Sequence, residues 1–481
     1  MLSDDLIRLA LDTAIGTGAD YAEARTEDSQ AERIHVRNGA VERLTTERDT
    51  GWGIHVLAGG GWGFAASSFD DPTSIRQTAL RAVEMARASG TRRRSRSDLS
   101  VMSTERGEYR TPLEKDPFAV PIADRIALML EASGRMSAAN PRVRVSTGTL
   151  SCSRTRKLYA NTTGAHLRQE IVYVGAWIAA IAVADDGYAY SRSYGDMSQS
   201  GWEFIEQLNL PAEGQRVGSE AAELVVAPWA PSGPTDVVLA SDFVALLVHE
   251  SCGHPTELDR VLGWEAAFAG TSFLTPDMLG SFRYGSPLVN MTADSLLQGG
   301  LGTFGWDDEG TPAQRTPIVR EGIFTGYLTS RESALAIGQR SNGCARATSW
   351  GRIPLVRMVN VSLEPGSGSL QDLIAGVDHG LYIETPSSWS LDDKRMNFHF
   401  SGELCREIRG GRLGGLYKAA AFQGRTPAFW GSVRGIAGPQ EWRLWGLPHC
   451  AKGEPLQLCS VSHGASPILV SGLQMSEARK A

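Results

Sequence analysis

A proline-rich segment near the middle of the chain constrains the fold most, because no regular element can run across it. Residues 227–234 read Ala-Pro-Trp-Ala-Pro-Ser-Gly-Pro, with three prolines in eight positions. Proline removes a backbone N–H donor and glycine favours turns, so neither a helix nor a central strand crosses this segment. We therefore expect a domain boundary between Pro211 and Pro234, and we divide the chain into residues 1–212 and 213–481.

Periodic patterns on both sides of this boundary indicate an α+β fold. Apolar residues at helical spacing predict four helices, over residues 4–15, 72–89, 122–139 and 214–224. Strand-like runs occupy residues 21–25, 32–38, 40–46, 53–57, 62–67 and much of 143–194, with turn signals at Asn38-Gly39 and Gly59-Gly60-Gly61. Beyond the boundary we expect a strand, one helix and many short strands. The sequence thus predicts two α+β domains, the second of them rich in strands.

Composition and charge exclude several classes of protein. The 481 residues are 42% hydrophobic and 21% charged, which suits packed cores and argues against a largely disordered chain. The formal net charge of -7 provides no domain-wide basic surface, so we do not expect nucleic acid as a partner. The one dense basic run, Arg92–Arg96, is more typical of a solvated loop.

Neither a membrane span nor a disulfide framework is expected. The longest nearly continuous apolar run, Ile171–Ala184, has 14 residues, whereas a spanning helix needs roughly 18 or more. The acidic N-terminus lacks the pattern of a secretory signal. Six scattered cysteines contain no Cys-x-x-Cys pair. These features favour a cytoplasmic protein.

The most informative chemical pattern lies in an apolar helix after the predicted strand Val237–Ala240. Ser241 is its predicted N-cap, and residues 249–255 read His-Glu-Ser-Cys-Gly-His-Pro. This His-Glu-x-x-x-His spacing is one residue longer than the His-Glu-x-x-His of common zinc peptidases. In a regular helix two positions five apart differ by about 140° around the axis, so the two imidazoles would diverge.

A distortion of the helix would resolve this divergence. Gly253 weakens the helix and Pro255 disfavours the α conformation at His254, so we expect a break or a widened, π-type turn. Both imidazoles then bind one divalent ion, and Glu250 acts as general base on a water. The alternative is a helix end with two hydrogen-bonded histidines.

These residues, with Glu257 and Asp259, resemble the signature of the TldD/PmbA family, specifically its TldD-type metallopeptidase subunit. The resemblance spans essentially the whole chain. It extends to Gly18–Glu23, Val36–Glu42, Asp307–Gly310, Arg357 with Asn360, and Cys450-Ala451-Lys452. The last segment is similar to the family's Cys-Gly-Lys, whose cysteine completes the metal site. The resemblance therefore implies Zn²⁺ held by His249, His254 and Cys450.

The third ligand stays open on the sequence alone. A catalytic zinc has three protein ligands and keeps one position for water, and a thiolate suits zinc. Two departures from the family pattern, Ala451 and the longer segment Gly453–Gln457, leave the register uncertain. The alternatives to Cys450 are His449, Cys459 and Glu257.

Several other polar residues have two interpretations each. Glu257 and Asp259 either orient an imidazole N–H or are solvated carboxylates at a helix end. Three consecutive acids, Asp307–Glu309, cannot all face one point, so a structural turn is favoured over a cation site. Helical direction turns Cys252 away from the metal side, which favours packing. The remaining histidines show no partner spacing, and we expect ordinary core or surface residues at His379, His399 and His463.

The resemblance implies a zinc-dependent peptidase that hydrolyses unfolded or short peptides, with Glu250 as its catalytic residue. It also implies a PmbA/TldE-type subunit as heterodimer partner, although a homodimer is possible. Two alternatives compete. One is a hydrolase of a small peptide-like or amide intermediate in a biosynthetic pathway. The other is a non-catalytic scaffold subunit, against which the intact His249, Glu250 and His254 argue.

Overall fold

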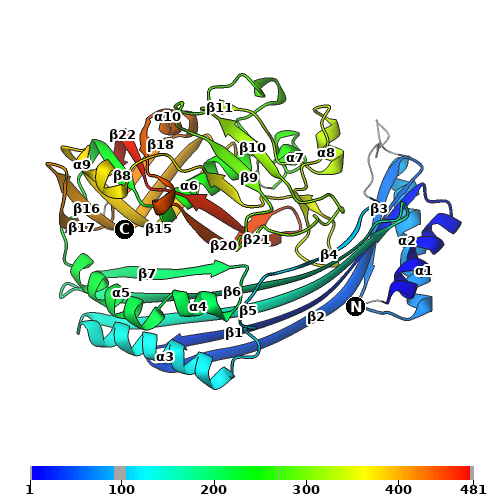
Figure 1. The fold of residues 1–481 in the computed structure, drawn as a ribbon, viewed down its shortest axis with the longest axis horizontal. Helices are drawn as coiled ribbons and strands as arrows, with labels where there is room; N and C mark the ends of the chain where they lie inside the picture. Colours follow the sequence, from blue (N-terminus) through cyan, green and yellow to red (C-terminus); the bar gives the residue numbers. More distant parts are fainter. Residues whose placement is uncertain (1–2, 92–103, 269, 477–481) are drawn as a thin grey trace.

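The computed structural model describes residues 3–91, 104–268 and 270–476. It contains two large sheets with helices packed on them, one sheet built from each half of the chain (Figure 1). The predicted α+β class with a strand-rich C-terminal part is confirmed. The basic run Arg92–Arg96 lies outside the described residues. No helix within those residues is both long and apolar enough to span a bilayer.

The N-terminal sheet is long and curved (Figure 1). Its strands follow the order β3-β2-β1-β5-β6-β4, and β7 also pairs with β6. The strands of this half are β1 (Tyr21–Arg37), β2 (Ala40–Ala58), β3 (Gly61–Ser67), β4 (Arg106–Arg110), β5 (Val143–Asn161), β6 (His166–Val183) and β7 (Ala189–Ser198). The helices are α1 (Asp4–Gly16), α2 (Pro72–Gly90), α3 (Ile122–Ala139), α4 (Trp202–Gln207) and α5 (Leu210–Leu224).

Two separate apolar cores lie at opposite ends of this sheet. At one end α1 and α2 pack over Trp52 and Ile54 of β2. At the other, α3 and α5 cover Leu150 of β5 and Ile178 of β6. Neither core covers the middle of the sheet. Polar side chains there, such as Glu27, face the C-terminal half of the chain.

The C-terminal half surrounds a second sheet of order β15-β8-β22-β18-β16-β17, with β19 on β22 and β15 also paired with β16. Its strands are β8 (Gly233–Leu239), β15 (His379–Leu391), β16 (Asn397–Arg409), β17 (Arg412–Tyr417), β18 (Ala421–Arg425), β19 (Val433–Ile436) and β22 (Ile468–Ser476). Helix α6 (Ser241–Val248) packs on it through Phe243, which contacts Phe400 and Phe422. The motif helix is therefore embedded in the apolar core.

Smaller sheets complete this half. One has the order β11-β10-β9-β14, and the hairpins β12-β13 and β20-β21 stand apart. Their strands are β9 (Met291–Asp294), β10 (Arg315–Arg320), β11 (Ile323–Phe324), β12 (Ala345–Arg346), β13 (Leu355–Val356), β14 (Val361–Leu363), β20 (Arg443–Lys452) and β21 (Gln457–Ala465). Short helices are α7 (Leu258–Val261), α8 (Arg331–Leu335), α9 (Leu370–Ala375) and α10 (Thr426–Gly431).

Most predicted helices are confirmed within two residues, but other details differ. The predicted helix 214–224 begins earlier, at Leu210, and α4 was not predicted. The expected N-cap at Ser241 is wrong, because Ala240 caps α6 and Ser241 is its first helical residue. The division of the chain at residues 212 and 213 falls inside α5 and stays a prediction.

Candidate metal centre

The motif helix widens where the sequence predicts. Helix α6 is followed by a π-helical turn, His249–Gly253, and then by a 3₁₀ turn, His254–Thr256. A π turn closes i→i+5 bonds, so it brings positions five apart onto one side. A Cβ on Gly253 would lie 1.9 Å from the sulfur of the buried Met358, so a larger residue would require this side chain to move. The expected distortion is confirmed.

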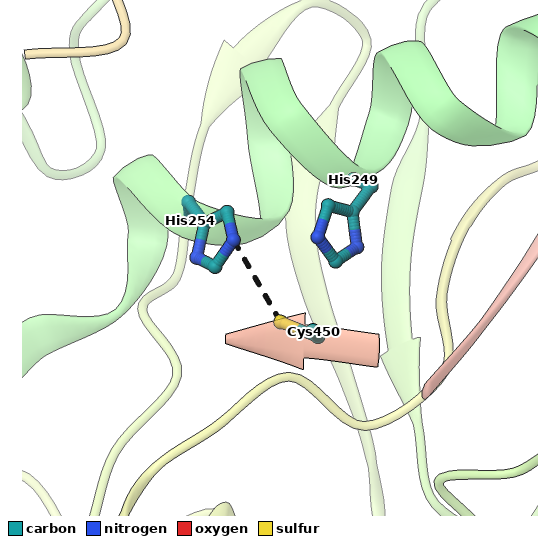
Figure 2. A group of neighbouring side chains, drawn as sticks. All are labelled: His249, His254 and Cys450. Atoms are coloured by element: carbon teal, nitrogen blue, oxygen red, sulfur yellow. Dashed lines mark hydrogen bonds between the residues drawn. The ribbon is translucent and has the colours of Figure 1, made fainter. Parts of the chain in front are cut away.

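The two histidines and Cys450 come together at this turn. One ligand atom from each of the three lies within 4.8 Å of the others, and Cys450 Sγ is 3.7 Å from His254 Nε2. Figure 2 shows both imidazoles on the widened helix directed toward the cysteine on β20. All three side chains are buried. The structure thus brings together three residues that lie on two elements almost 200 positions apart along the chain.

The alternative third ligands lie elsewhere. Cys459 is opposite Cys450 in the β20-β21 hairpin and does not belong to the three-residue group. His449 is exposed. Glu257 contacts His254 through the other ring nitrogen, with its Oε2 at 2.9 Å from His254 Nδ1.

That contact decides which nitrogen of His254 can bind a metal. Because the Glu257 carboxylate only accepts, His254 Nδ1 carries the hydrogen and donates it. The lone pair on Nε2 then points toward Cys450. Carboxylate-to-histidine contacts of this kind orient metal ligands in proteins. Of the two interpretations of Glu257, orientation of an imidazole is the one that the structure supports.

His463 has the same effect on His249, and sequence reasoning missed it. Its Nε2 lies 2.7 Å from His249 Nδ1, and its own Nδ1 lies 2.7 Å from the carbonyl oxygen of Val361. The carbonyl only accepts, so His463 Nδ1 donates, its Nε2 accepts, and His249 Nδ1 donates to it. His249 Nε2 is left free for a metal. His463 is buried, but it is more than an ordinary core residue.

Glu250 is held between two side chains of the β15-β16 hairpin. The indole Nε1 of Trp389 donates to Oε1 at 2.9 Å, and Arg395 Nη1 donates to Oε2 at 2.5 Å. Burial raises the pKa of Glu250, and the charge of Arg395 opposes that shift. Each oxygen retains a further lone pair, so the carboxylate can still accept a proton from a water.

A buried charge cluster lies behind His254. Lys452 is fully buried and donates to Asp259 at 2.7 Å, with Glu257 at 3.4 Å and Glu265 at 3.7 Å. The idea that Asp259 orients an imidazole is therefore wrong, because its carboxylate pairs with Lys452 instead. Lys452 compensates the negative charge that Glu257 places beside the histidine.

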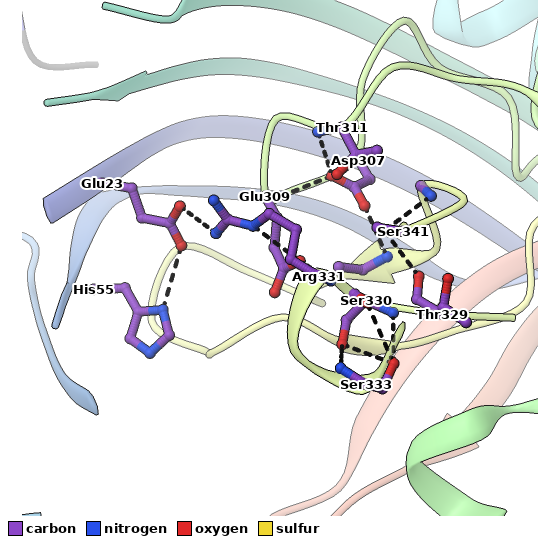
Figure 3. A network of polar contacts seen from close by, with 12 residues as sticks. Glu23, His55, Asp307, Glu309, Thr311, Thr329, Ser330, Arg331, Ser333 and Ser341 are labelled. Carbon is purple, nitrogen blue, oxygen red and sulfur yellow. Dashed lines mark hydrogen bonds and ion pairs between the residues drawn. The ribbon is translucent and has the colours of Figure 1, made fainter. Parts of the chain in front are cut away.

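The remaining predicted residues have structural roles. Cys252 is fully buried in the core, as expected. His379 is exposed beside Asp378, and His399 lies on β16 and does not belong to the three-residue group. The acidic turn is confirmed as structural, because its three side chains diverge. Asp308 pairs with Lys157. Asp307 accepts from three backbone amides, and Glu309 pairs with Arg331 (Figure 3).

The donor set fits zinc. Two neutral imidazoles and a thiolate are zinc ligands, and three protein ligands leave a position for water. Burial and nearby charges hold the pKa of His249 and of His254 well below the usual range, so both are neutral. Burial raises the pKa of the Cys450 thiol to about 12, so a metal must displace its proton to bind.

Comparison with known proteins identifies the family of this chain. Three consecutive family models match the chain: PmbA/TldA metallopeptidase domain 1 over residues 22–86, the central domain over 115–227, and the C-terminal domain over 232–477. The chain belongs to the PmbA/TldD family. Every residue of the candidate centre lies within the segment matched by the third model of this PmbA/TldD family.

Two relatives and one solved structure illustrate the range of the PmbA/TldD family. A protein of Methanothermobacter thermautotrophicus named Metalloprotease is 27% identical over 436 residues, which are 90% of each chain. A Saccharolobus solfataricus protein named Zinc metalloprotease TldD homolog is 30% identical over 155 residues, 32% of this chain and 33% of that protein. The crystal structure of TldE from Thermococcus kodakarensis superposes with a TM-score of 0.77 at 15% identity, covering 98% of this chain and 99% of that one, which establishes a shared fold.

Proposed function

We propose that this chain is a zinc-dependent peptidase of TldD type that hydrolyses unfolded or short peptides. One observation carries the proposal: the ligand atoms of His249, His254 and Cys450 lie within 4.8 Å of one another beside Glu250. The names of the relatives support a metalloprotease activity, and one of those names includes zinc.

The chain's own residues provide positioning and proton transfer. A bound zinc would polarise a peptide carbonyl and lower the pKa of a water. Glu257 and His463 hold the two imidazoles in the tautomer that presents Nε2. Glu250 accepts the proton of the attacking water and passes it to the leaving amine nitrogen. Trp389 and Arg395 fix the carboxylate in the orientation that this transfer requires.

Separating metal binding from chemistry tests the proposal. In the Glu250→Gln variant, zinc content stays at one ion per chain while hydrolysis of a peptide library falls by about 10² to 10⁴-fold. Metal analysis and mass spectrometry of the digest measure both. Glu84→Gln, a change at an exposed position of α2, is the matched control and keeps full activity. Undiminished hydrolysis by Glu250→Gln would refute the mechanism.

We further propose that the working form is a heterodimer with a PmbA/TldE-type subunit. The likeness in fold to TldE supports this assembly, because paired paralogous subunits commonly share one architecture. Light scattering of the purified chain, alone and mixed with a PmbA/TldE-type protein of the same organism, measures the mass of the complex. A stable homodimer that does not exchange would contradict the heterodimer.

A further inference from the structure

A cleft of about 550 Å³ lies between the two halves of the molecule, and two of its lining residues, His463 and Trp389, contact residues of the candidate metal centre. One wall is β7 of the N-terminal sheet, and the others are α6, β15 and β20 of the C-terminal half. Figure 1 shows β7 facing these C-terminal elements. The volume falls in the range of about 300 to 1,000 Å³ that small-molecule and cofactor sites occupy.

The cleft follows the face of α6 that ends at the catalytic residues. Asp242, Ala245 and Leu246 line it. Side chains four positions apart lie on one face of an α-helix, so this face continues from Ala245 to His249 and from Leu246 to Glu250. The cleft thus runs along the helix in the direction of the metal ligands.

Two lining residues contact the centre directly. His463 hydrogen-bonds His249, and Trp389 hydrogen-bonds Glu250. Glu250 itself is only 6% exposed, whereas Trp389 is 46% exposed, which is unusual for an indole at the edge of a buried site. Trp389 therefore presents its ring to the cleft and its N–H to the general base.

The walls combine aromatic side chains with charged ones. Three indoles line the cleft, those of Trp177, Trp389 and Trp445, with the ring of Tyr194 between the sheets. The Trp445 indole is fixed by a hydrogen bond from its Nε1 to Ser241 Oγ at 3.2 Å. Gly195 makes room for Trp177, because a Cβ at that position would lie 2.6 Å from the ring.

Two arginines in the same walls are held in ion pairs. Arg192 is buried and pairs with Glu384 at 2.5 Å, with Glu220 and Glu403 also bound to it. Arg216 pairs with Glu213 at 2.5 Å. The ion pair of Arg192 with Glu384 joins two walls of the cleft. Asp242, Glu441 and Arg443 also line it, beside its aromatic and aliphatic surface.

We infer that this cleft binds the substrate of the metal centre and selects peptides with an aromatic or large aliphatic side chain close to the scissile bond. The inference rests on the proposed peptidase function, and it adds a side-chain preference and the residues that create it. Rigid indoles bury a large apolar side chain at little entropic cost, which gives the cleft its selectivity.

Binding to the metal-free protein tests the inference without turnover. The probes are blocked pentapeptides, Ac-Ala-Ala-Xaa-Ala-Ala-NH₂, with Phe, Leu, Asp or Lys at the central position. Calorimetry on the full chain should give dissociation constants about tenfold lower for Phe and Leu than for Asp and Lys, as burial of one large side chain predicts. Trp445→Ala should remove this difference, and Trp445→Phe should retain it. Trp264→Ala, at an exposed indole outside the cleft, should have no effect.

Equal affinity for the four peptides, no binding of any of them, or an unchanged preference in Trp445→Ala would overturn the assignment of the cleft. The affinities of the wild-type protein for the four peptides test the inference even if Trp445→Ala fails to fold. Circular dichroism shows whether that variant is folded. A preference for Phe and Leu with no hydrolysis after zinc loading, both alone and together with a PmbA/TldE-type subunit, would refute the peptidase and leave the cleft as a binding site. Hydrolysis without any preference among the four peptides would refute only the assignment of the cleft as the site of side-chain selection.

Discussion

His463 Nε2 lies 2.7 Å from His249 Nδ1 and links β21 to the first histidine of the motif. The Val361 carbonyl determines the direction of this hydrogen bond, because it accepts from the other nitrogen of His463. Burial lowers the pKa of His463 to about 4, so the ring stays neutral and able to accept at neutral pH. A strand near the C-terminus therefore sets the tautomer of a residue on a distant helix.

The first prediction follows from this contact. His463→Ala should lower zinc affinity by about 10 to 100-fold, because the partner of His249 Nδ1 is lost while the three ligands remain. Competition with a chromophoric chelator measures the dissociation constant. His379→Ala, at an exposed histidine, is the control. If both variants bind zinc as tightly as wild type, His463 has no role in the centre.

The second prediction concerns the two neighbouring cysteines of the β20-β21 hairpin. Cys450→Ser should weaken zinc binding at least about tenfold, because a hydroxyl is a poor substitute for a soft thiolate. Cys459→Ser should leave binding unchanged, because Cys459 lies outside the group of ligand atoms. Zinc content after dialysis measures both variants. The opposite pattern would move the third ligand to Cys459.

The third prediction addresses the contact between the two halves. Arg331 is buried and pairs with Glu23 of β1 at 2.6 Å and with Glu309 at 3.3 Å (Figure 3). Arg331→Leu leaves the buried Glu23 and the partly buried Glu309 without this cation, which should cost about 3 kcal/mol. Urea unfolding measures the change. Arg135→Ala, which breaks an exposed pair with Glu131, should cost less than about 0.5 kcal/mol.

The ion pair between Glu23 and Arg331 also makes the stability of the contact between the two halves depend on pH. Burial alone would raise the pKa of Glu23, but Arg331 and His55 outweigh burial and lower it to about 2. A carboxylate with a depressed pKa stabilises the folded state above its unfolded pKa of 4.5, and that contribution is lost as the pH falls toward 2. The stability difference between wild type and Arg331→Leu should therefore narrow in acid.

The fourth prediction concerns Asp196, whose contribution to the stability of the fold changes with pH in the opposite direction to that of Glu23. Burial raises the pKa of Asp196 from 3.8 to about 7, so folding favours its protonated form and stability falls as the pH rises from 4 to 7. Met197 and Gly446 both donate backbone N–H groups to Oδ1, which asparagine retains. Asp196→Asn should stabilise the protein at pH 8 by on the order of 2 kcal/mol and have little effect at pH 4. Thermal melts at both values measure this. Equal effects at the two pH values, or no effect in excess of Asp185→Asn at an exposed position, would contradict it.

The helices could be predicted because their patterns are local, whereas the long strands could not. The sequence predicts no strand over residues 26–31 of β1, since Thr-Glu-Asp-Ser-Gln-Ala has no apolar alternation. They are nevertheless strand, because β2 and β5 pair with them on either side. Their polarity reflects the middle of the sheet, where charged groups of the other half face them.

The candidate site also contains residues that the local sequence predicts and residues that it does not. His249, Glu250 and His254 were found because their spacing is local, and the π turn followed from Gly253 and Pro255. Cys450 came only through resemblance to a family. His463, Trp389 and Arg395 were missed, since each reaches the motif through tertiary contacts and has no short-range signature. Tertiary contacts between residues more than 100 positions apart produce no local pattern in a single sequence.

The separation of 196 positions between His254 and Cys450 also determines when the candidate metal centre can form during synthesis. During synthesis the motif helix leaves the ribosome long before β20, at about 5 to 20 residues per second. The histidines and Glu250 then exist without the thiolate and without His463, so the metal centre is incomplete. A nascent chain that lacks β20 and β21 would therefore carry no working form of the proposed peptidase beside its own unfolded segments. The proposed hydrolytic chemistry is withheld until these two strands have been made.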